Sequence, residues 1–414
     1  MTQTQDILVI GAGIIGISTA LALQSVGRSV VVLDRKGVAG ETSAGNAGAF
    51  AFPEVEPLAT PGIMLKAPKW LLDPLGPLSI PPAYALKIAP WMLRFWRASW
   101  PDRYAAAVEA QVALMRHCEA ALPRQIAATD GEYMMMRDGQ LQLYEGTRAY
   151  AAALPAWEVR RAHGIAFDLL ESPEAIAEIQ PGLASRFTHA GFTPSWLSTV
   201  NPKGWTEHLA AAFVARGGRI EKADVRALEA SDADVTVHTA EGPRLATQVV
   251  VAAGAWSHHL ARTLGERFPL ETERGYNTTL PPGAFDLRTH LTFSAHGFVA
   301  SKISGGVRIG GAVELGGLDL PPNFRRADIL LEKAKSFLPG LNTEGGTQWM
   351  GYRPSLPDSL PVIDHSTRAP GVTYAFGHGH LGLTQSAGTA ELVTALVQRQ
   401  SPPIPMQPFS ATRF

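Results

Sequence analysis

The chain has 414 residues, which is enough for two domains with substantial cores. Its formal net charge of −1 gives no electrostatic case for nucleic acid as a partner. The single cysteine, Cys118, excludes an internal disulfide and a thiolate-held iron–sulfur cluster. No secretory leader is visible before the first apolar segment, so we expect a cytoplasmic protein.

The amino-terminal stretch predicts a dinucleotide-binding unit. Ile7–Ile10 is an apolar run typical of a buried parallel strand, and glycines follow it directly at GxGxxG spacing. A helical pattern runs from Ile14 to about Val26, and a second strand, 29–33, leads into an acid. A diphosphate is expected at the helix N-terminus, and the acid is expected to accept hydrogen bonds from the adenosine ribose. We place in this site Gly11, Gly13, Ile14, Ile15, Gly16, Asp34 and Arg35.

Two other interpretations of this stretch stay open. A glycine-rich turn can bind nothing. Residues 7–27 also form an uncharged run of 21 residues, long enough for a transmembrane helix. The glycine spacing and the strand pattern that follows favour the nucleotide site.

The loop after Asp34 is long and rich in small, hydrogen-bonding residues, which suits close approach to a flat ring system, although a plain surface loop has the same composition. Within it, 41–43 (Glu-Thr-Ser) and 46–48 (Asn-Ala-Gly) resemble the flavin loop of the FAD-dependent D-amino-acid dehydrogenase family, part of the larger D-amino-acid oxidase and glycine/sarcosine oxidase group. The resemblance implies that FAD is the cofactor. It implies FAD contacts from Thr42, Ser43, Asn46, Ala47 and Gly48.

Residues 63–100 combine four tryptophans and five basic residues with a single acid, Asp73. Repeated prolines prevent one spanning helix. The composition suits peripheral contact with a membrane, on the inner face of the cell membrane. The alternative is a helical excursion that covers the active site and buries its aromatic side chains.

The middle of the chain alternates helical and strand patterns. Helices are predicted at about 105–128, 148–163, 173–179, 202–214 and 325–337. Strands are predicted at 139–144, 187–192, 219–221, 235–239 and within 268–314. The family resemblance implies that Val225 lies near the adenine end of FAD.

Residues 248–257 form a second motif, a buried strand that runs into Ala-Gly-Ala. It resembles the second dinucleotide signature of this flavoprotein group, although the end of an ordinary buried strand can have the same residue pattern. The resemblance places Ala253, Gly254 and Trp256 at the cofactor.

Near the carboxyl end, a strand at 372–376 leads into glycines 377, 379 and 382 and then an apolar helix. Backbone N–H groups at such a helix start favour negative charge, as on a reduced flavin. We place at the flavin Gly379, His380, Leu381, Gly382, Leu383 and Thr384. His378 and His380 could supply two metal ligands, but no third is apparent, so we expect no metal.

Residues 351–354 resemble the Gly-x-Arg-Pro element of the family, which implies that Arg353 pairs with the substrate carboxylate and also touches FAD. A guanidinium fork suits a carboxylate on physical grounds too, although a structural ion pair is the alternative. Arg274, Tyr276 and Asn277 resemble substrate-wall residues, and Tyr276 could add a hydrogen bond to the carboxylate. The predicted catalytic residues are Arg353, Tyr276 and His380.

The expected fold is α/β: a Rossmann-type FAD-binding domain (1–60, 195–262 and 340–414) interleaved with an α+β substrate-binding domain (61–194 and 263–339) on a mostly antiparallel sheet. The implied reaction is oxidative deamination of a D-amino acid, or of a D-imino acid such as a D-proline derivative, with electrons passing to a quinone or carrier. Residues 352–361 also look similar to a D-hydroxyproline dehydrogenase-like subgroup. Two alternatives remain: a glycine/sarcosine-type oxidase that uses oxygen, and a non-catalytic flavin-binding subunit.

Overall fold

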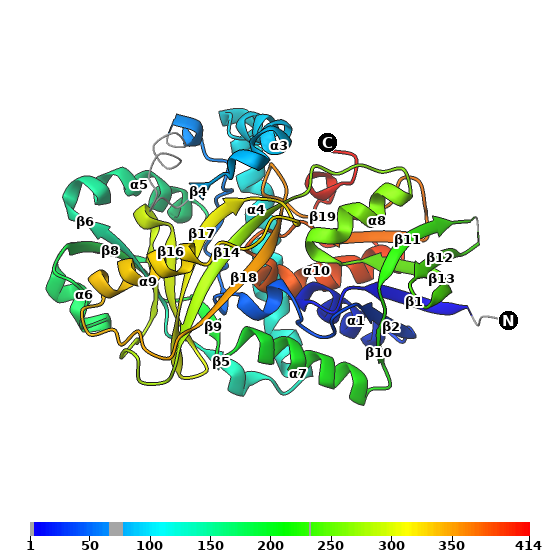
Figure 1. Cartoon of the computed structure of the whole chain (residues 1–414), viewed down its shortest axis with the longest axis horizontal. Coiled ribbons are helices and arrows are strands. Elements are labelled where there is room, and N and C mark those ends of the chain that lie inside the picture. Colours follow the sequence, from blue (N-terminus) through cyan, green and yellow to red (C-terminus); the bar gives the residue numbers. More distant parts are fainter. Residues whose placement is uncertain (1–3, 66–77, 232) are drawn as a thin grey trace.

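The computed structural model describes residues 4–65, 78–231 and 233–414 of the chain. Two large β-sheets lie towards opposite ends of the molecule, and long helices lie between and around them (Figure 1). A third sheet consists of three short strands in the order β3-β9-β5. Its strands are β3 (Ala49–Phe50), β9 (Leu197–Thr199) and β5 (Met135–Met136).

The first sheet has a parallel centre in the order β10-β2-β1-β13-β20, with antiparallel neighbours β12, β11 and β19. Its strands are β1 (Gln5–Ile10), β2 (Val30–Asp34), β10 (Arg219–Lys222), β11 (Val225–Ala230), β12 (Val235–Thr239), β13 (Gly242–Val251), β19 (Val362–His365) and β20 (Val372–Phe376).

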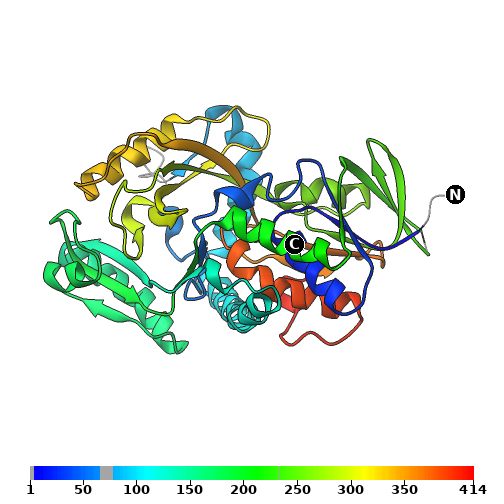
Figure 2. The ribbon, with the colours of Figure 1, turned by 90° about the horizontal axis from the view of Figure 1, so that it is seen from below.

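The centre of this sheet is buried on both faces, as its apolar strands require. Ile7 and Val9 of β1 pack into a core shared with helices, whereas Leu8 and Ile10 pack on the other face against residues of β11 and β12. Figure 2 shows two of these helices side by side beneath the sheet, α1 in blue and α10 in red. The helices on this face are α1 (Ile14–Ser25), α4 (Pro101–Ala128), α7 (Pro202–Ala215) and α10 (Gly382–Val397).

The second sheet is mostly antiparallel, in the order β18-β14-β17-β16-β15-β6-β8-β7, with β4 beside β17. One face packs its apolar residues against α6 (Pro173–Ile179) and α9 (Arg325–Phe337). Its strands are β4 (Leu78–Ser79), β6 (Gln140–Glu145), β7 (Asp168–Leu170), β8 (Phe187–Thr193), β14 (Glu271–Leu280), β15 (His290–Phe293), β16 (Phe298–Ile303), β17 (Gly306–Leu315) and β18 (Thr347–Ser355).

The remaining helices are shorter or peripheral. They are α3 (Ala85–Ala98), α5 (Gly146–Ala162), α8 (Ser257–Thr263), and the 3₁₀ turns η1 (Thr42–Gly45), η2 (Pro82–Tyr84), η3 (Glu132–Met134), η4 (Gly254–Trp256), η5 (Ser294–His296) and η6 (Gln407–Phe409).

The predicted α/β fold is confirmed. The helix expected from about 105 begins four residues earlier, at Pro101, which is tolerated in the first turn of a helix. The transmembrane interpretation of residues 7–27 is wrong, because this run holds a strand, a turn and a helix of 12 residues. No helix among the described residues is long and apolar enough to cross a membrane.

The two-domain division stays a prediction, but one strand crosses its boundary. The sequence pattern places residues 340–414 in the FAD-binding domain, whereas β18 pairs with β14 along nine positions of the second sheet. The segment 63–100 is described only in part. Its residues 66–77, with Trp70, lie outside the described residues, and the rest contains β4, η2 and α3.

Candidate active site

The turn between β1 and α1 has no room for side chains. Gly11 has a φ of +113°, and a Cβ there would lie 2.3 Å from the carbonyl oxygen of Ala252. A Cβ on Gly16 would lie 1.8 Å from the carbonyl oxygen of Gly11. Glycine therefore lets β1, α1 and the end of β13 meet with their backbones exposed to a ligand.

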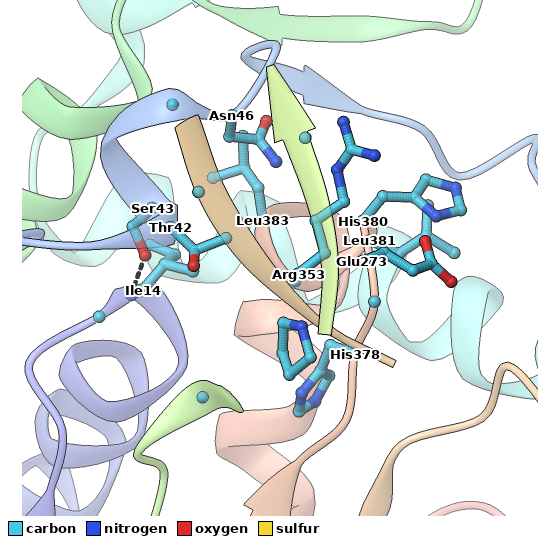
Figure 3. A pocket seen from close by; sticks show the side chains of 18 of the residues that line it. Ile14, Thr42, Ser43, Asn46, Glu273, Arg353, His378, His380, Leu381 and Leu383 are labelled. Atoms are coloured by element: carbon cyan, nitrogen blue, oxygen red, sulfur yellow. Dashed lines mark hydrogen bonds between the residues drawn. The ribbon is translucent and has the colours of Figure 1, made fainter. Parts of the chain in front are cut away.

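The N-terminus of α1 opens onto a cavity without a side-chain cap from Gly13, its N-cap residue. The N–H of Ile14 donates to the hydroxyl of Ser43 at 3.0 Å (Figure 3). The other N–H groups of the first turn are the positive end of the helix dipole, which suits a diphosphate.

Asp34 organises the end of β2. One carboxylate oxygen accepts the N–H of Ala12 at 2.8 Å, and the other accepts those of Lys36 and Gly37 at 2.7 and 2.9 Å. A carboxylate has about four lone-pair sites, so these three bonds leave capacity for a ribose hydroxyl.

The loop predicted to contact flavin is anchored from the second sheet. The hydroxyl of Thr42 donates to the carbonyl oxygen of Tyr352 at 2.8 Å. Arg308 donates from Nη1 to the carbonyl oxygens of Ala44 and Asn46, at 3.1 and 2.5 Å. Burial lowers the pKa of Arg308 to about 10, so it keeps its charge at neutral pH. The loop conformation thus depends on a buried cation that reaches it from β17.

The start of α10 faces the same space. The α10 N-terminus has no side-chain cap, and the hydroxyl of Thr384 accepts the N–H of Ala51 at 2.9 Å and donates to the carbonyl oxygen of Ala49 at 3.3 Å. These bonds tie the helix start to the segment that follows the flavin loop.

Arg35 and Trp256 stack at the other end of the space, with the guanidinium carbon 3.9 Å from the ring centroid. Val225, Ala253 and Gly254 line this end as well. An aromatic ring covered by a guanidinium gives a flat surface of the kind that an adenine uses.

All these segments border one cavity of about 860 Å³. Every residue predicted for the site lines it except Gly16, Gly48 and Arg274. The volume lies near the upper end of the range for ligand pockets, roughly 300–1,000 Å³. The residues present therefore fit an FAD: an uncapped helix N-terminus for the diphosphate, a carboxylate for the ribose, and glycine-rich backbone along a flat ring.

Arg353 extends from β18 across the cavity wall. A Cβ on Gly275 would lie 2.3 Å from its Nη2, so the guanidinium lies directly over that glycine of β14. Its Nη1 donates to the carbonyl oxygen of Ala312 in β17 at 3.0 Å. Burial lowers the pKa of Arg353 from its usual value, and nearby Glu273 raises it. The guanidinium has further N–H groups that can bind a carboxylate in the cavity.

His380 opens onto the cavity, whereas His378 points into the protein. Burial and nearby Arg353 lower the pKa of His380 to about 4, so its ring is neutral at pH 7. The Nε2 of His378 lies 3.1 Å from the hydroxyl of Thr389, and burial lowers the pKa of His378 to about 3. Within the described parts of the chain, no group of three His, Cys, Asp or Glu side chains could hold a metal ion.

Comparisons with known proteins agree with this geometry. The family model described as "FAD dependent oxidoreductase" (DAO) matches residues 6–396. The chain belongs to this family. It is 33% identical to a D-amino-acid oxidase of Bradyrhizobium diazoefficiens, with 100% of both chains covered. It is 30% identical to D-amino acid dehydrogenase 1 of Mesorhizobium japonicum, with 99% of both covered. The fold matches glycine oxidase from Geobacillus kaustophilus with a TM-score of 0.81 at 20% identity, covering 100% of both chains.

The predicted family, the FAD cofactor and the assignment as an FAD-dependent oxidoreductase are confirmed. The roles of single residues in this DAO-family chain stay predictions, and the structure shows where each residue lies.

Tyr276 lines the cavity, but its hydroxyl is engaged elsewhere. It donates to Glu314 at 2.5 Å and accepts the N–H of Asn323 at 3.0 Å. Arg274 is fully buried and donates to the carbonyl oxygens of residues 317, 320 and 321. Strand alternation explains this arrangement, because 274 and 276 point to the face of β14 opposite Gly275 and Arg353. The geometry gives no support to a hydrogen bond from Tyr276 to a substrate.

Sequence reasoning missed three further groups that line the cavity. The sequence pattern indicates Arg308 and Glu273 only as residues of the predicted strands within 268–314, whereas both line the cavity. Buried Arg160 lies 3.5 Å from Glu54 and 3.6 Å from Glu56. Alternation along β14 could have indicated Glu273, two positions before Gly275, but only with the pairing of β14 and β18 in hand.

Proposed function

We propose that this DAO-family enzyme oxidises a D-amino acid, or a D-imino acid such as a D-proline derivative. The relatives named D-amino-acid oxidase and D-amino acid dehydrogenase support this substrate class. The observation that carries the proposal is the guanidinium of Arg353, fixed over Gly275 at the wall of the cavity.

Arg353 would bind the substrate carboxylate through two parallel hydrogen bonds, because a guanidinium matches a carboxylate in shape and charge. A fixed carboxylate orients the α-carbon, so only one stereoisomer presents its hydrogen to the cofactor. FAD, when bound, supplies the acceptor for the hydride that leaves the α-carbon. The imine product then hydrolyses to a 2-oxo acid and ammonia.

The cofactor would be held by the groups already described. The N-terminus of α1 faces the diphosphate, Asp34 the ribose, and Thr42, Ser43 and Asn46 the flavin with the start of α10. The uncapped start of α10 favours negative charge, which a flavin gains on reduction.

An anaerobic titration tests the proposal. D-amino acids, including D-proline, are added to the FAD-loaded enzyme without oxygen, and the flavin absorbance is followed. Bleaching by D- but not L-isomers is the expected result, and the Arg353→Lys variant should need much higher substrate concentrations. Failure of every amino acid to bleach the flavin would contradict the proposal and favour a non-catalytic flavin-binding subunit.

We also propose that electrons leave the enzyme to a quinone or an electron carrier rather than to oxygen. Turnover with an artificial dye but without hydrogen peroxide supports this acceptor. Peroxide formed in proportion to substrate identifies an oxidase, as the name of the Bradyrhizobium relative suggests for that protein.

The exposed face of α3 supports contact with an anionic membrane surface. Leu86, Leu93 and Trp96 are 91%, 64% and 47% exposed, whereas Ile88 and Trp91 are buried against Leu315. The helix lies on the outer edge of the molecule (Figure 1). The basic residues Lys87 and Arg94 flank the exposed apolar side chains. An apolar helix face with a basic border is complementary to anionic lipid headgroups.

A further inference from the structure

Glu273 is a carboxylate enclosed in the ligand cavity. It lies in β14, lines the cavity, and is only 5% exposed. None of the described residues forms an ion pair with it within 4 Å, although the charge of Arg353 and a hydrogen bond with the hydroxyl of Ser355 both lower the pKa of Glu273 against the larger effect of burial. A carboxylate has about four acceptor sites, and the Ser355 hydroxyl fills only one of them, so Glu273 keeps capacity for a cationic donor that enters the cavity.

Glu273 and Arg353 occupy directly opposite positions of two paired strands. Side chains at opposite positions start about 5 Å apart and share one face of the sheet. The guanidinium of Arg353 then runs along this face to lie over Gly275, two residues beyond Glu273. The guanidinium of Arg353 and the carboxylate of Glu273 therefore lie next to each other along the same cavity wall, where one small ligand can contact both.

The carboxylate also borders a second, very small cavity of about 10 Å³, together with His380, Glu56 and Ser355. Figure 3 shows the carboxylate beside the ring of His380, with the guanidinium of Arg353 further along the strand. A space of this size holds about one water-sized group.

The titratable and charged groups that face Glu273 come from three neighbouring segments: Arg353 on β18, His378 and His380 before α10, and Glu56 before α3. Both histidines are neutral at pH 7, and Glu56 is engaged by the hydroxyl of Tyr104 at 2.6 Å. Burial raises the pKa of Glu273 above its ordinary value, which makes the carboxylate a better proton acceptor.

We propose that Glu273 binds the α-ammonium group of the substrate and removes one proton from it. The proposal rests on the proposed function. An N–H bond breaks and an O–H bond forms on Glu273, which leaves a neutral amine and a carboxylic acid. The freed nitrogen lone pair can then form the C=N bond of the iminium product as the α C–H bond breaks, and FAD, when bound, would supply the acceptor for the departing hydride. Glu273 thereby converts the amine of the substrate that Arg353 has positioned into the neutral form that can be oxidised.

The test compares Glu273→Gln with Glu271→Gln. Glu271 lies two residues earlier on β14 and is also largely enclosed. It does not line the cavity, and its carboxylate accepts a hydrogen bond from the Tyr84 hydroxyl at 2.8 Å. Both variants are first checked for FAD content. For Glu273→Gln we expect kcat/KM at pH 7 to fall about a hundredfold and its pH profile to follow the ionisation of the substrate amine. Glu271→Gln should keep the wild-type profile.

A binding experiment gives a readout independent of turnover. 2-Aminoisobutyrate carries a carboxylate and an ammonium group but no α-hydrogen, and isobutyrate lacks the amine. Wild type should bind the amine-bearing ligand about tenfold more tightly, and Glu273→Gln should lose this preference while it binds isobutyrate unchanged. The preference in wild type should also weaken as the pH falls and Glu273 becomes protonated.

Two results would overturn the proposal. One is a wild-type enzyme that binds the amine-bearing ligand no more tightly than isobutyrate. The other is an active Glu273→Gln variant with the wild-type pH profile. A wild-type enzyme that no amino acid reduces is a different outcome, because it refutes the proposed function itself.

Discussion

Nη1 of Arg353 lies 3.0 Å from the carbonyl oxygen of Ala312, a residue held at a φ of +54°. Ala312 belongs to a bulge in β17, where two residues, 312 and 313, face the single residue Gly275 of β14. The bulge turns the Ala312 carbonyl toward the guanidinium. Three strands of the second sheet thus fix the head of one side chain.

Gly275→Ala should impair catalysis through Arg353. The added Cβ would lie 2.3 Å from Nη2, so the guanidinium must move, and a misplacement of about 1 Å can cost about a hundredfold in rate. We expect kcat/KM for a D-amino acid to fall by about this factor with unchanged FAD content. Gly340→Ala is the control, because its Cβ would meet only Phe285, at 3.8 Å. Equal kinetics for the two variants would show that Arg353 does not position the substrate.

The sequence indicated the nucleotide end of the site well because its requirements are local. Position 11 requires glycine because its φ is +113° and an added Cβ would lie 2.3 Å from the carbonyl oxygen of Ala252, and the GxGxxG spacing indicates this requirement. The same holds for the glycines before α10. Each of these segments performs its role with backbone groups that lie close together along the chain.

The substrate end could not be predicted in the same way, because it depends on pairing between distant strands. Gly275 and Arg353 are neighbours only because β14 pairs with β18, and nothing local in either strand reveals the register. The hydrogen bond to the substrate carboxylate expected of Tyr276 could not be checked from the sequence for the same reason. Its hydroxyl lies on the opposite face of the strand, bonded to Glu314.

Arg308→Gln should loosen FAD binding without reducing the reactivity of bound FAD. Arg308 is the buried donor to the carbonyl oxygens of Ala44 and Asn46, and loss of charged hydrogen bonds costs about 1.5–3 kcal/mol. We therefore expect the dissociation constant of FAD to rise about tenfold or more in a fluorescence titration of the apoprotein. Arg325→Gln, an exposed substitution at the start of α9, should leave it unchanged. Unaltered FAD affinity in Arg308→Gln would contradict the anchoring role.

Stability should fall as the pH drops from about 6.5 towards 4. Burial lowers the pKa of His290 to about 4, so between these values the unfolded chain binds more protons than the folded one, and acid favours unfolding. The difference from an ordinary histidine corresponds to about 3 kcal/mol. Urea unfolding of wild type and His290→Phe at several pH values measures this pH-dependent part of the free energy of unfolding. The variant should lose part of the pH dependence, whereas His238→Gln, at an exposed position, should retain it. Parallel curves for wild type and His290→Phe would contradict the assignment.

Substitutions on the outer face of α3 should reduce binding to anionic membranes. Leu93 and Trp96 are exposed and lie about one turn apart, so their side chains can enter a headgroup region together. Leu93→Ser combined with Trp96→Ser should lower cosedimentation with phosphatidylglycerol vesicles, while oxidation of a D-amino acid with a soluble dye stays at the wild-type level. Tyr133→Ser, which changes a side chain 73% exposed outside α3, is the control. Wild type should bind phosphatidylcholine vesicles weakly, because they lack the charge that Lys87 and Arg94 would contact. Equal vesicle binding by wild type and the double variant would show that α3 does not face the lipid.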